Sequence, residues 1–296
     1  MLSTPHMYGA VDGKAVVPLT PHIRWAARLP VRPALLPHRH RATLIALAAF
    51  YRETRTLGLA AATPDGSARL AAWEAVVRGM GDTPAMPHPV LTPLADACLP
   101  QRPLLDLIEA QRMRTHTFTY ETYNDLFHYC VLGANSLGRL VLAMLGDDDL
   151  EHVALTDAFC TALLQTQLWR DIARDYVRGR VYLPQEDLNL FGVSVEDLAE
   201  AVRNHQAGTN LRALIAFEVE RTRHLLDDGA QIAGTLKRRA RLNCALLAAD
   251  ARAMLMTIAR HGYDPFVMRP TLGRFERFEA IIGAAHLLTT PHLSER

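Results

Sequence analysis

Several residue types and patterns are scarce in this 296-residue chain. It has only four cysteines and two lysines, and its 32 basic residues nearly cancel its 31 acidic ones to leave a net charge of +1. Such a small net charge creates no global field that would attract nucleic acid, so we expect no nucleic-acid partner. The cysteines, Cys98, Cys130, Cys160 and Cys244, lack CxxC and zinc-ligand spacing. Their scatter argues against a disulfide scaffold, a zinc site or a redox pair, and is typical of a reducing cytoplasm.

Long apolar runs are also scarce. The apolar segments are interrupted by Arg or His well short of the length that spans a bilayer, and the first thirty residues hold four prolines but no run of signal-peptide length. We therefore expect a cytoplasmic protein without a transmembrane segment, and peripheral membrane contact stays open.

Thirty of the 32 basic residues are arginine. A GC-rich genome explains most of them, and phosphate binding is the functional alternative.

What the chain does have is helical periodicity. With 49% hydrophobic residues it can bury a large core, and no segment has the alternation of a strand ladder. The pattern predicts a Pro-rich N-terminal arm over residues 1–33 and a single all-α domain over residues 34–296. The helices are expected at about 36–60, 67–80, 102–114, 120–145, 149–178, 195–206, 210–236, 238–261 and 272–287.

Local signals support several of these boundaries. Gly146 and the three aspartates that follow it predict the end of one helix and the start of the next. Ser194 and Asp197 form a variant of the capping box at a further helix start. The aspartates at 147–149 could be mistaken for a metal motif, but carboxylates at a helix start are usually solvated charges that the helix dipole favours.

The segment at residues 165–184 contains the residues with the clearest chemical pattern. Gln167, Asp171 and Asp175 lie at positions i, i+4 and i+8, so on a helix their side chains line one face. Two carboxylates one turn apart suit Mg²⁺, which prefers oxygen ligands and leaves its other positions to water and diphosphate. The nearby cations are Arg170, Arg174, Arg178 and Arg180. A surface helix with Asp–Arg pairs would have the same spacing, so spacing alone leaves both interpretations open.

Three motifs carry a resemblance to a known family. The pattern Asp171-x-x-x-Asp175 followed by Gly-Arg-x-Tyr-Leu-Pro at 179–184 resembles the second Asp-rich motif of the squalene/phytoene synthase family. Residues 129–139, Tyr-Cys-Val-Leu-Gly-Ala-Asn-Ser-Leu-Gly-Arg, resemble the family's Tyr-Cys…Ala-x-x-x-Gly helix. Residues 262–266, followed by Arg269, resemble its late signature. The resemblance extends over roughly residues 30–280 and is nearest to the bacterial hopanoid-pathway squalene and hydroxysqualene synthases.

This resemblance implies an isoprenoid synthase fold, in which helices surround a deep active-site cavity. In that family Mg²⁺ bridges carboxylates to an allylic diphosphate, and ionisation leaves an allylic cation in an apolar cavity. Carried over to this sequence, the metal ligands would be Asp171 and Asp175. The diphosphate would be held by Arg170, Arg180, Arg55 and Gln167, which stands where the family usually has Asn. Tyr129 would lie beside the reacting carbons, although a core tyrosine with a satisfied hydroxyl fits the same position.

The first motif departs from the family. There the family usually reads Tyr-Arg-Phe-Ala-Arg-Thr-Ala-Asp-Asp-x-x-Asp, and residues 51–62 align with it without a gap. Gly58, Leu59 and Ala62 stand where the carboxylates belong, and Glu53 is the nearby acid. A diphosphate cannot be held in an apolar pocket without metal or arginine compensation. We therefore expect one diphosphate site, and an apolar wall that seats an acceptor without a diphosphate.

These features resemble the squalene-synthase-like aromatic prenyltransferases, which attach a short prenyl group, here with dimethylallyl favoured, to carbazole-type acceptors. The implied reaction is an electrophilic aromatic substitution in which Mg²⁺ and arginines stabilise the departing diphosphate. Trp169 is the first choice to stack on the acceptor, before Tyr120 and Phe127. The base could be the diphosphate, a tyrosine, or a histidine such as His116 or His128.

Two alternatives stay open at this point. A hopanoid-type squalene or hydroxysqualene synthase that acts on presqualene diphosphate also needs one diphosphate site. A non-catalytic relative would keep only the fold, but the joint presence of Asp171, Asp175, Arg170 and Arg180 argues against it.

Overall fold

The computed structural model describes residues 38–80 and 89–273, and all regular structure within these ranges is helical. A short 3₁₀ turn, η2 (His38–His40), precedes the first helix, and a π-helical turn, η3 (Val131–Asn135), joins α5 to α6. The α-helices are α1 (Arg41–Ala60), α2 (Pro64–Arg78), α3 (Thr92–Asp96), α4 (Gln101–His116), α5 (Tyr123–Cys130), α6 (Ser136–Leu145), α7 (Leu150–Arg170), α8 (Ile172–Val177), α9 (Gln185–Leu190), α10 (Val195–Asn204), α11 (Thr209–Gly229), α12 (Ile232–Thr235) and α13 (Arg238–Arg260).

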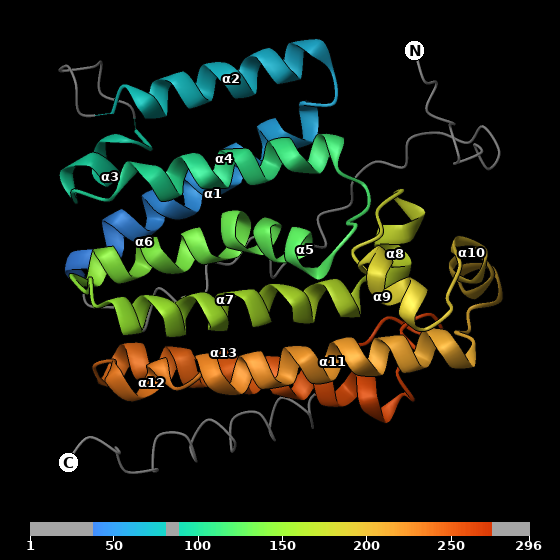
Figure 1. The fold of residues 1–296 in the computed structure, drawn as a ribbon. Helices are drawn as coiled ribbons and strands as arrows, with labels where there is room; N and C mark the ends of the chain where they lie inside the picture. The colour runs from blue at the N-terminus through green and yellow to red at the C-terminus, as the bar shows by residue number, and fades with distance from the viewer. Residues whose placement is uncertain (1–37, 81–88, 274–296) are drawn as a thin grey trace.

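The long helices are stacked in roughly parallel rows. In Figure 1 the stack runs from α2 on one side to α11 and α13 on the other, and the short helices α8, α9 and α10 gather at one end. One core cluster fills the space between α1, α2, α4 and α6, and a second fills the space around α7, α11 and α13. The all-α prediction is confirmed.

The predicted helices match the observed ones with four differences. The short helices α3 and α9 were not predicted, because five or six residues carry too little periodicity. The predicted helix at 149–178 is interrupted at Asp171, and that at 210–236 is interrupted between α11 and α12. The predicted arm at 1–33 lies outside the described residues. Residues 272–273 are not helical, and the rest of the helix predicted at 272–287 also lies outside the described part.

The predicted helix boundaries around Gly146 and Ser194 are confirmed. Gly146 adopts a left-handed conformation with φ of 75°, which permits the chain to turn after α6. Asp149 then caps α7 by accepting hydrogen bonds from the N–H groups of Glu151 and His152. Ser194 and Asp197 form a complete capping box at the start of α10. The aspartates at 147–149 therefore act locally at a helix start, as the sequence indicated.

Within the described residues, two helical stretches are long and apolar enough, by length and composition only, to cross a membrane. They cover Tyr123–Leu145 and Arg239–Arg260, and the sequence interpretation did not anticipate them. More than half of each apolar window is buried inside the protein, at 56% and 61%. The first stretch packs against α4 and α7, and the second packs against α7, α11 and α12. Burial of this kind is what a core helix of a helical domain requires.

The last turn of α1 approaches α4 closely at Gly58. A Cβ atom at this position would lie 2.5 Å from the Cβ of Gln111. We expect Gly58→Ala to lower the free energy of unfolding by about 1–3 kcal/mol, because neither Cβ can rotate away from its helix. Gly133→Ala is the matched control, since its Cβ would meet Ala110 at an ordinary 3.6 Å. Equal stability of the two variants in urea denaturation would contradict this packing.

Candidate active site

The C-terminal ends of α1, α4 and α7 lie toward the end of the molecule that holds α8 (Figure 1), and most of the residues that the sequence singled out belong to these helices. The chain bends at Asp171, whose φ of −105° and ψ of 11° separate α7 from α8. This corrects the expectation of one continuous helix. The N–H of Asp175 nevertheless donates to the carbonyl of Asp171 at 2.9 Å. The two carboxylates therefore still lie on successive turns.

Asp171 is the most strongly held carboxylate of the site. It is 3% exposed, and three arginines surround it. Arg170 donates to both carboxylate oxygens at 3.2 and 2.7 Å, Arg174 donates to Oδ2 at 2.6 Å, and Arg269 donates to Oδ1 at 2.6 Å. Burial alone would raise the pKa of Asp171, but the hydrogen bonds from Arg170 and Arg269 outweigh it and hold the pKa below its ordinary value.

Asp175 is held much more loosely. Its closest cations are Arg174 at 3.7 Å and Arg178 at 3.9 Å, which are ion pairs without a short hydrogen bond. Burial raises the pKa of Asp175 above its ordinary value, and the nearby charge of Arg174 only partly offsets this. Asp175 therefore has carboxylate oxygens available for a further cation.

The oxygen atoms around this bend fit a magnesium ion. One turn before Asp171, the buried Oε1 of Gln167 has no hydrogen-bond partner. A buried amide oxygen without a donor is costly unless a ligand satisfies it. Gln167, Asp171 and Asp175 together would present the hard oxygen donors that Mg²⁺ prefers. No group of three His, Cys, Asp or Glu side chains suited to a metal occurs in the described residues, so a metal here would depend on two carboxylates and this amide.

Arg180 ties the loop after α8 to α4. Its backbone N–H donates to the carbonyl of Asp175 at 2.9 Å, and its guanidinium donates to the carbonyl of Arg114 at 3.1 Å. The Nε of Arg180 is buried without a hydrogen-bond partner, as is the Nε of Arg174. The loop thus brings unsatisfied N–H donors beside Asp175, which is the arrangement that an anionic ligand requires.

Three tyrosine rings form a cluster next to these groups. The centroids of Tyr120, Tyr129 and Tyr182 lie 5.8–6.0 Å apart. Burial raises the pKa of Tyr129 well above its ordinary value, so its hydroxyl stays neutral. Tyr129 is therefore brought to the site, as the sequence predicted, whereas Tyr182 was overlooked as a site residue although it belongs to the motif at 179–184. We call these three residues the tyrosine cluster.

The α1 and α4 helices add two arginines to the site. The charge of Arg55 acts on Tyr51, Tyr129 and Arg174, so this residue lies near the tyrosine cluster, and its binding of diphosphate stays a prediction. Arg114 was not predicted, and its charge acts on the same tyrosines. Burial lowers the pKa of Arg55, and the charge of Arg114 also contributes to lowering it. No sequence signal distinguishes Arg114 from the surface arginines of an amphipathic helix.

The predicted acceptor wall on α1 is only partly formed. Gly58 is buried beneath Gln111, but Leu59 is 43% exposed and Ala62 is exposed just beyond the end of α1. Leu59 follows Arg55 by four residues, so it lies one turn further along the same face. The last turn of α1 therefore reaches the protein surface, and the apolar residues predicted to form the acceptor wall are not all enclosed. A seat for an acceptor at Gly58, Leu59 and Ala62 stays a prediction.

Trp169 does not line a pocket, contrary to the prediction. It is 0% exposed, and its indole Nε1 donates to Thr222 of α11 at 2.7 Å. The core between α7 and α11 therefore encloses this ring.

The other aromatic and histidine candidates also differ in their surroundings. Phe127 stacks on Tyr123, and His116 and His128 are exposed. Neither histidine is enclosed with the tyrosine cluster.

The segment after α13 reaches back to the site through Asp264 and Arg269. Asp264 is 2% exposed, and its carboxylate accepts hydrogen bonds from the N–H of Ala207, the N–H of Phe266 and the guanidinium of Arg212 at 3.0–3.1 Å. This buried anchor holds the chain that carries Arg269 to Asp171. The resemblance singled out residues 262–266 as a motif. It did not predict that this segment brings Arg269 to Asp171.

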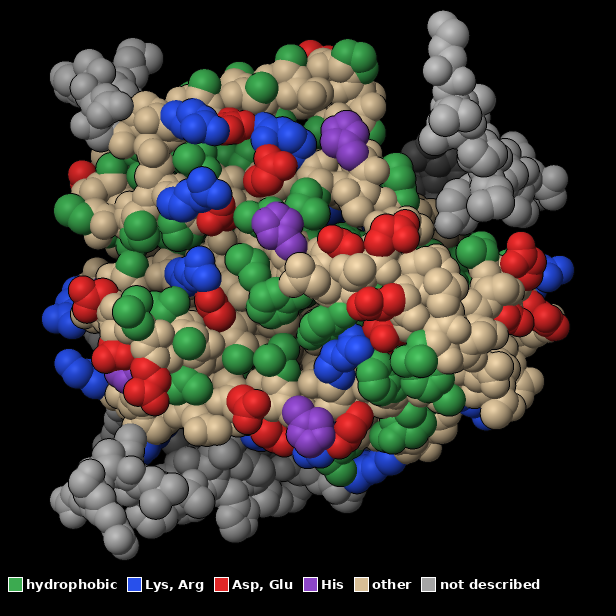
Figure 2. Space-filling model, in the orientation of Figure 1, with side chains coloured by type: hydrophobic (Ala, Val, Ile, Leu, Met, Phe, Trp, Pro, Cys, Tyr) green, Lys and Arg blue, Asp and Glu red, His purple; other side chains and the backbone are tan. Residues whose placement is uncertain are grey.

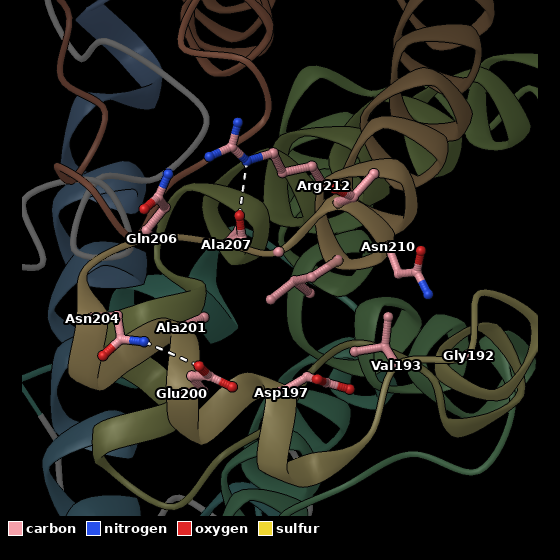
Figure 3. A pocket seen from close by; sticks show the side chains of 13 residues that line it. Gly192, Val193, Asp197, Glu200, Ala201, Asn204, Gln206, Ala207, Asn210 and Arg212 are labelled. Carbon is pink, nitrogen blue, oxygen red and sulfur yellow. Dashed lines mark hydrogen bonds between the residues drawn. The ribbon is translucent and has the colours of Figure 1, made fainter.

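A separate polar pocket lies between α10 and the start of α11 (Figure 3), with a volume of about 590 Å³. Its polar groups bond to one another, since Asn204 donates to Glu200 at 3.2 Å and Arg212 donates to the carbonyl of Ala207 at 2.9 Å. Its lining includes neither Asp171 nor Asp175. We therefore do not assign it to the active site.

The described residues on one face of the molecule show no field of one charge. On the face shown in Figure 2, acidic and basic side chains are interspersed. Many of them form local ion pairs, as Arg223 does with Glu220 and Asp227. The positive charge available to an anionic ligand therefore comes from the enclosed arginines of the site and not from this surface.

Two buried acidic residues, Glu218 and Asp187, lie against Arg221. Glu218 of α11 is 0% exposed and contacts Arg221 at 3.2 Å. Burial raises the pKa of Glu218 to about 8. Arg221 also bonds Asp187 at 3.0 Å and lies 4.1 Å from the ring centroid of Tyr123. Glu218 therefore keeps its proton near neutral pH.

The proton on Glu218 predicts a pH-dependent stability. Between about pH 5 and pH 8 the unfolded chain has lost the Glu218 proton while the folded protein still binds it, so stability falls as the pH rises. We expect the free energy of unfolding to decrease over this range by about 2–4 kcal/mol more in the wild type than in Glu218→Gln. Urea denaturation at a series of pH values measures the difference. Parallel curves for the two proteins would contradict the assignment.

Comparisons with known proteins agree with this geometry. A family model described as squalene/phytoene synthase matches residues 27–276. Hydroxysqualene synthase of Rhodopseudomonas palustris is 32% identical over 214 residues, which cover 70% of each chain. Phytoene synthase of Mycobacterium tuberculosis is 27% identical over 228 residues, which cover 76% of this chain and 74% of the relative.

Solved structures show the same fold. Squalene synthase HpnC from Alicyclobacillus acidocaldarius superposes with a TM-score of 0.71 at 33% identity, over 78% of this chain and 88% of that one. A dehydrosqualene synthase superposes with a TM-score of 0.76 at 24% identity, over 86% and 89% of the two chains, and supports the fold alone.

Proposed function

We propose a function from the premise that this chain belongs to the squalene/phytoene synthase family, whose members are prenyltransferases. The chain transfers a short prenyl group, dimethylallyl in the first place, from an allylic diphosphate to an acceptor that has no diphosphate. The acceptor is an electron-rich aromatic compound of the carbazole type. The reaction depends on Mg²⁺ and takes place in the cytoplasm.

One observation carries this proposal. Both carboxylates of the site, Asp171 and Asp175, belong to the bend between α7 and α8, whereas the site-facing part of α1 offers Arg55, Gly58 and Leu59. Glu53, the acid in this half of α1, is exposed. The site can thus hold one diphosphate through metal, and the α1 side is left for a different substrate.

The side chains have distinct roles in this reaction. Asp171, Asp175 and Gln167 would hold Mg²⁺. When bound, this ion supplies Lewis-acid stabilisation of the leaving diphosphate. Arg170 and Arg180 place positive charge near the departing oxygens. The faces of the tyrosine cluster stabilise the allylic cation by cation–π attraction and exclude water.

The experiment measures diphosphate release with Mg²⁺ from dimethylallyl, geranyl, farnesyl and presqualene diphosphates. Each donor is supplied with and without a panel of hydroxycarbazoles and indoles. We expect release from dimethylallyl diphosphate that depends on the acceptor, together with a prenylated aromatic product. No acceptor dependence with any donor would overturn the proposal.

A second function is favoured by a specific observation. The identities of 32% to a hydroxysqualene synthase and 33% to a squalene synthase point to presqualene diphosphate, which carries one diphosphate. Turnover of presqualene diphosphate alone in the same assay would establish this function. Silence with every donor would favour a non-catalytic relative.

A further inference from the structure

Arg114 has an environment that differs from that of its neighbours on α4. One Nη donates to Gln111 at 3.1 Å, the Arg114 carbonyl accepts from Arg180, and the charge of its guanidinium acts on Tyr182. Its Nε is buried and has no hydrogen-bond partner. By contrast, Arg112 pairs with Glu74 and Glu109. Arg114 therefore has an unsatisfied donor enclosed in the site.

Among the described residues, no carboxylate forms an ion pair with Arg55 or Arg114, although the charge of Arg114 acts on Asp175. Their charges also act on each other, and that of Arg174 acts on Arg55. Enclosed like charges repel, and they are stable when a counter-anion lies between them. Arg114 thus has no paired anion among the described residues, and its Nε is free to donate to one.

Arg114 adjoins both halves of the site, because its charge acts on Asp175 and its side chain hydrogen-bonds a residue that faces α1. Gln111, its hydrogen-bond partner, packs on Gly58 of α1, on the side that the proposed function assigns to the acceptor. Arg114 also contacts the tyrosine cluster through Tyr182. Its guanidinium therefore lies between the acceptor side and the rings that would face the allylic cation.

We propose that Arg114 binds an oxygen anion of the acceptor, so that the accepted substrates are aromatic compounds with an ionised phenol or a carboxylate. This inference rests on the proposed function and specifies its substrate class. A guanidinium recognises such an oxygen by charge-assisted hydrogen bonds. Arg114 is thus a specificity-determining residue on the acceptor side.

The consequence for a phenolic acceptor is direct. Ionisation places electron density on the ring carbons ortho and para to the oxygen. The allylic C–O bond breaks with its electron pair remaining on the diphosphate, and a ring carbon forms the new C–C bond. The proton lost from that carbon passes to a diphosphate oxygen, which restores aromaticity. No oxidant or reductant is consumed.

The test compares matched acceptors with dimethylallyl diphosphate and Mg²⁺. Each pair consists of an acid and its neutral analogue, namely a hydroxycarbazole and its methyl ether, or a carbazole carboxylic acid and its methyl ester. We expect the wild type to prefer the acid by about 10- to 100-fold in kcat/KM, the effect of a hydrogen bond to a charged group. Arg114→Gln should abolish this preference and Arg114→Lys should retain part of it. Arg112→Gln is the control and should behave as the wild type.

The outcomes separate this inference from the proposed function. If the wild type prenylates acids and neutral analogues equally, or if Arg114→Gln keeps the preference, the inference is wrong while the proposed function stands. If no aromatic compound is prenylated, the proposed function fails, and binding of inorganic phosphate in a buffer with EDTA decides whether the anion site exists.

In that second assay we expect phosphate at about ten times its Kd to raise the wild-type melting temperature by about 3 °C. Arg112→Gln should show the same rise. Loss of the rise in Arg114→Gln supports the anion site. An equal rise in Arg114→Gln, or none in the wild type, overturns it.

Discussion

Asp175→Asn should lower kcat/KM for the allylic diphosphate by about 10²–10³-fold, the loss expected when one electrostatic contact to the leaving group is removed. Asp175 has no short hydrogen bond to an arginine, so its carboxylate is available to a metal ion. The amide keeps the shape of the side chain and removes the charge. Steady-state kinetics of diphosphate release over a range of Mg²⁺ concentrations measures the effect, and far-UV circular dichroism verifies the fold.

The control for this variant is Asp157→Asn. Asp157 lies on α7 and pairs with Arg139, with both side chains partly exposed. We expect its activity to stay within about twofold of the wild type, since exposed pairs contribute little. Near-normal turnover in Asp175→Asn would rule out the metal assignment. Asp171→Asn is a less specific probe, because it also removes the partner of Arg170, Arg174 and Arg269.

Asp264→Ala should lower the free energy of unfolding by about 3–5 kcal/mol, the loss expected when one partner of a buried, hydrogen-bonded ion pair is removed. The substitution leaves the N–H groups of Ala207 and Phe266 and the guanidinium of Arg212 without their acceptor. For a chain of this size the melting temperature should fall by about 10 °C. Because Arg269 follows Asp264 closely, activity should also decrease.

Asp227→Ala provides the matched control. Asp227 also bonds two arginines, Arg223 and Arg252, but its side chain is 41% exposed. Its replacement should cost less than about 1 kcal/mol. If the two variants have equal melting temperatures, Asp264 does not anchor the segment that carries Arg269.

Much of the site could be predicted from short-range pattern and resemblance. The spacing of Gln167, Asp171 and Asp175 predicted a shared face, and their hydrogen-bonded turns preserve it. The bend at Asp171 was not predictable, because no proline or glycine marks it. The three arginines on this carboxylate accompany the bend, and one of them comes from a segment 98 residues away.

Other roles could not be distinguished by sequence. Arg112 and Arg114 are two positions apart in one helix, and only one points into the site. Trp169 precedes the Arg170–Asp171 pair and looked like an acceptor contact, but α11 covers it and Thr222 accepts its N–H. The face of a helix that meets another helix depends on how the two helices cross, which the residues of one helix do not specify.

By itself, the amino-acid sequence determined the helical class, the caps at Asp149 and Ser194, and the register of the two site carboxylates. These features depend on side chains within about one helical turn, whose interactions follow from local geometry. The tertiary structure alone decided which cations meet Asp171, that Arg114 is enclosed with the tyrosine cluster, and that Trp169 belongs to the core. These contacts join residues far apart in the chain, so they arise only when the helices pack and exclude water from the polar groups between them.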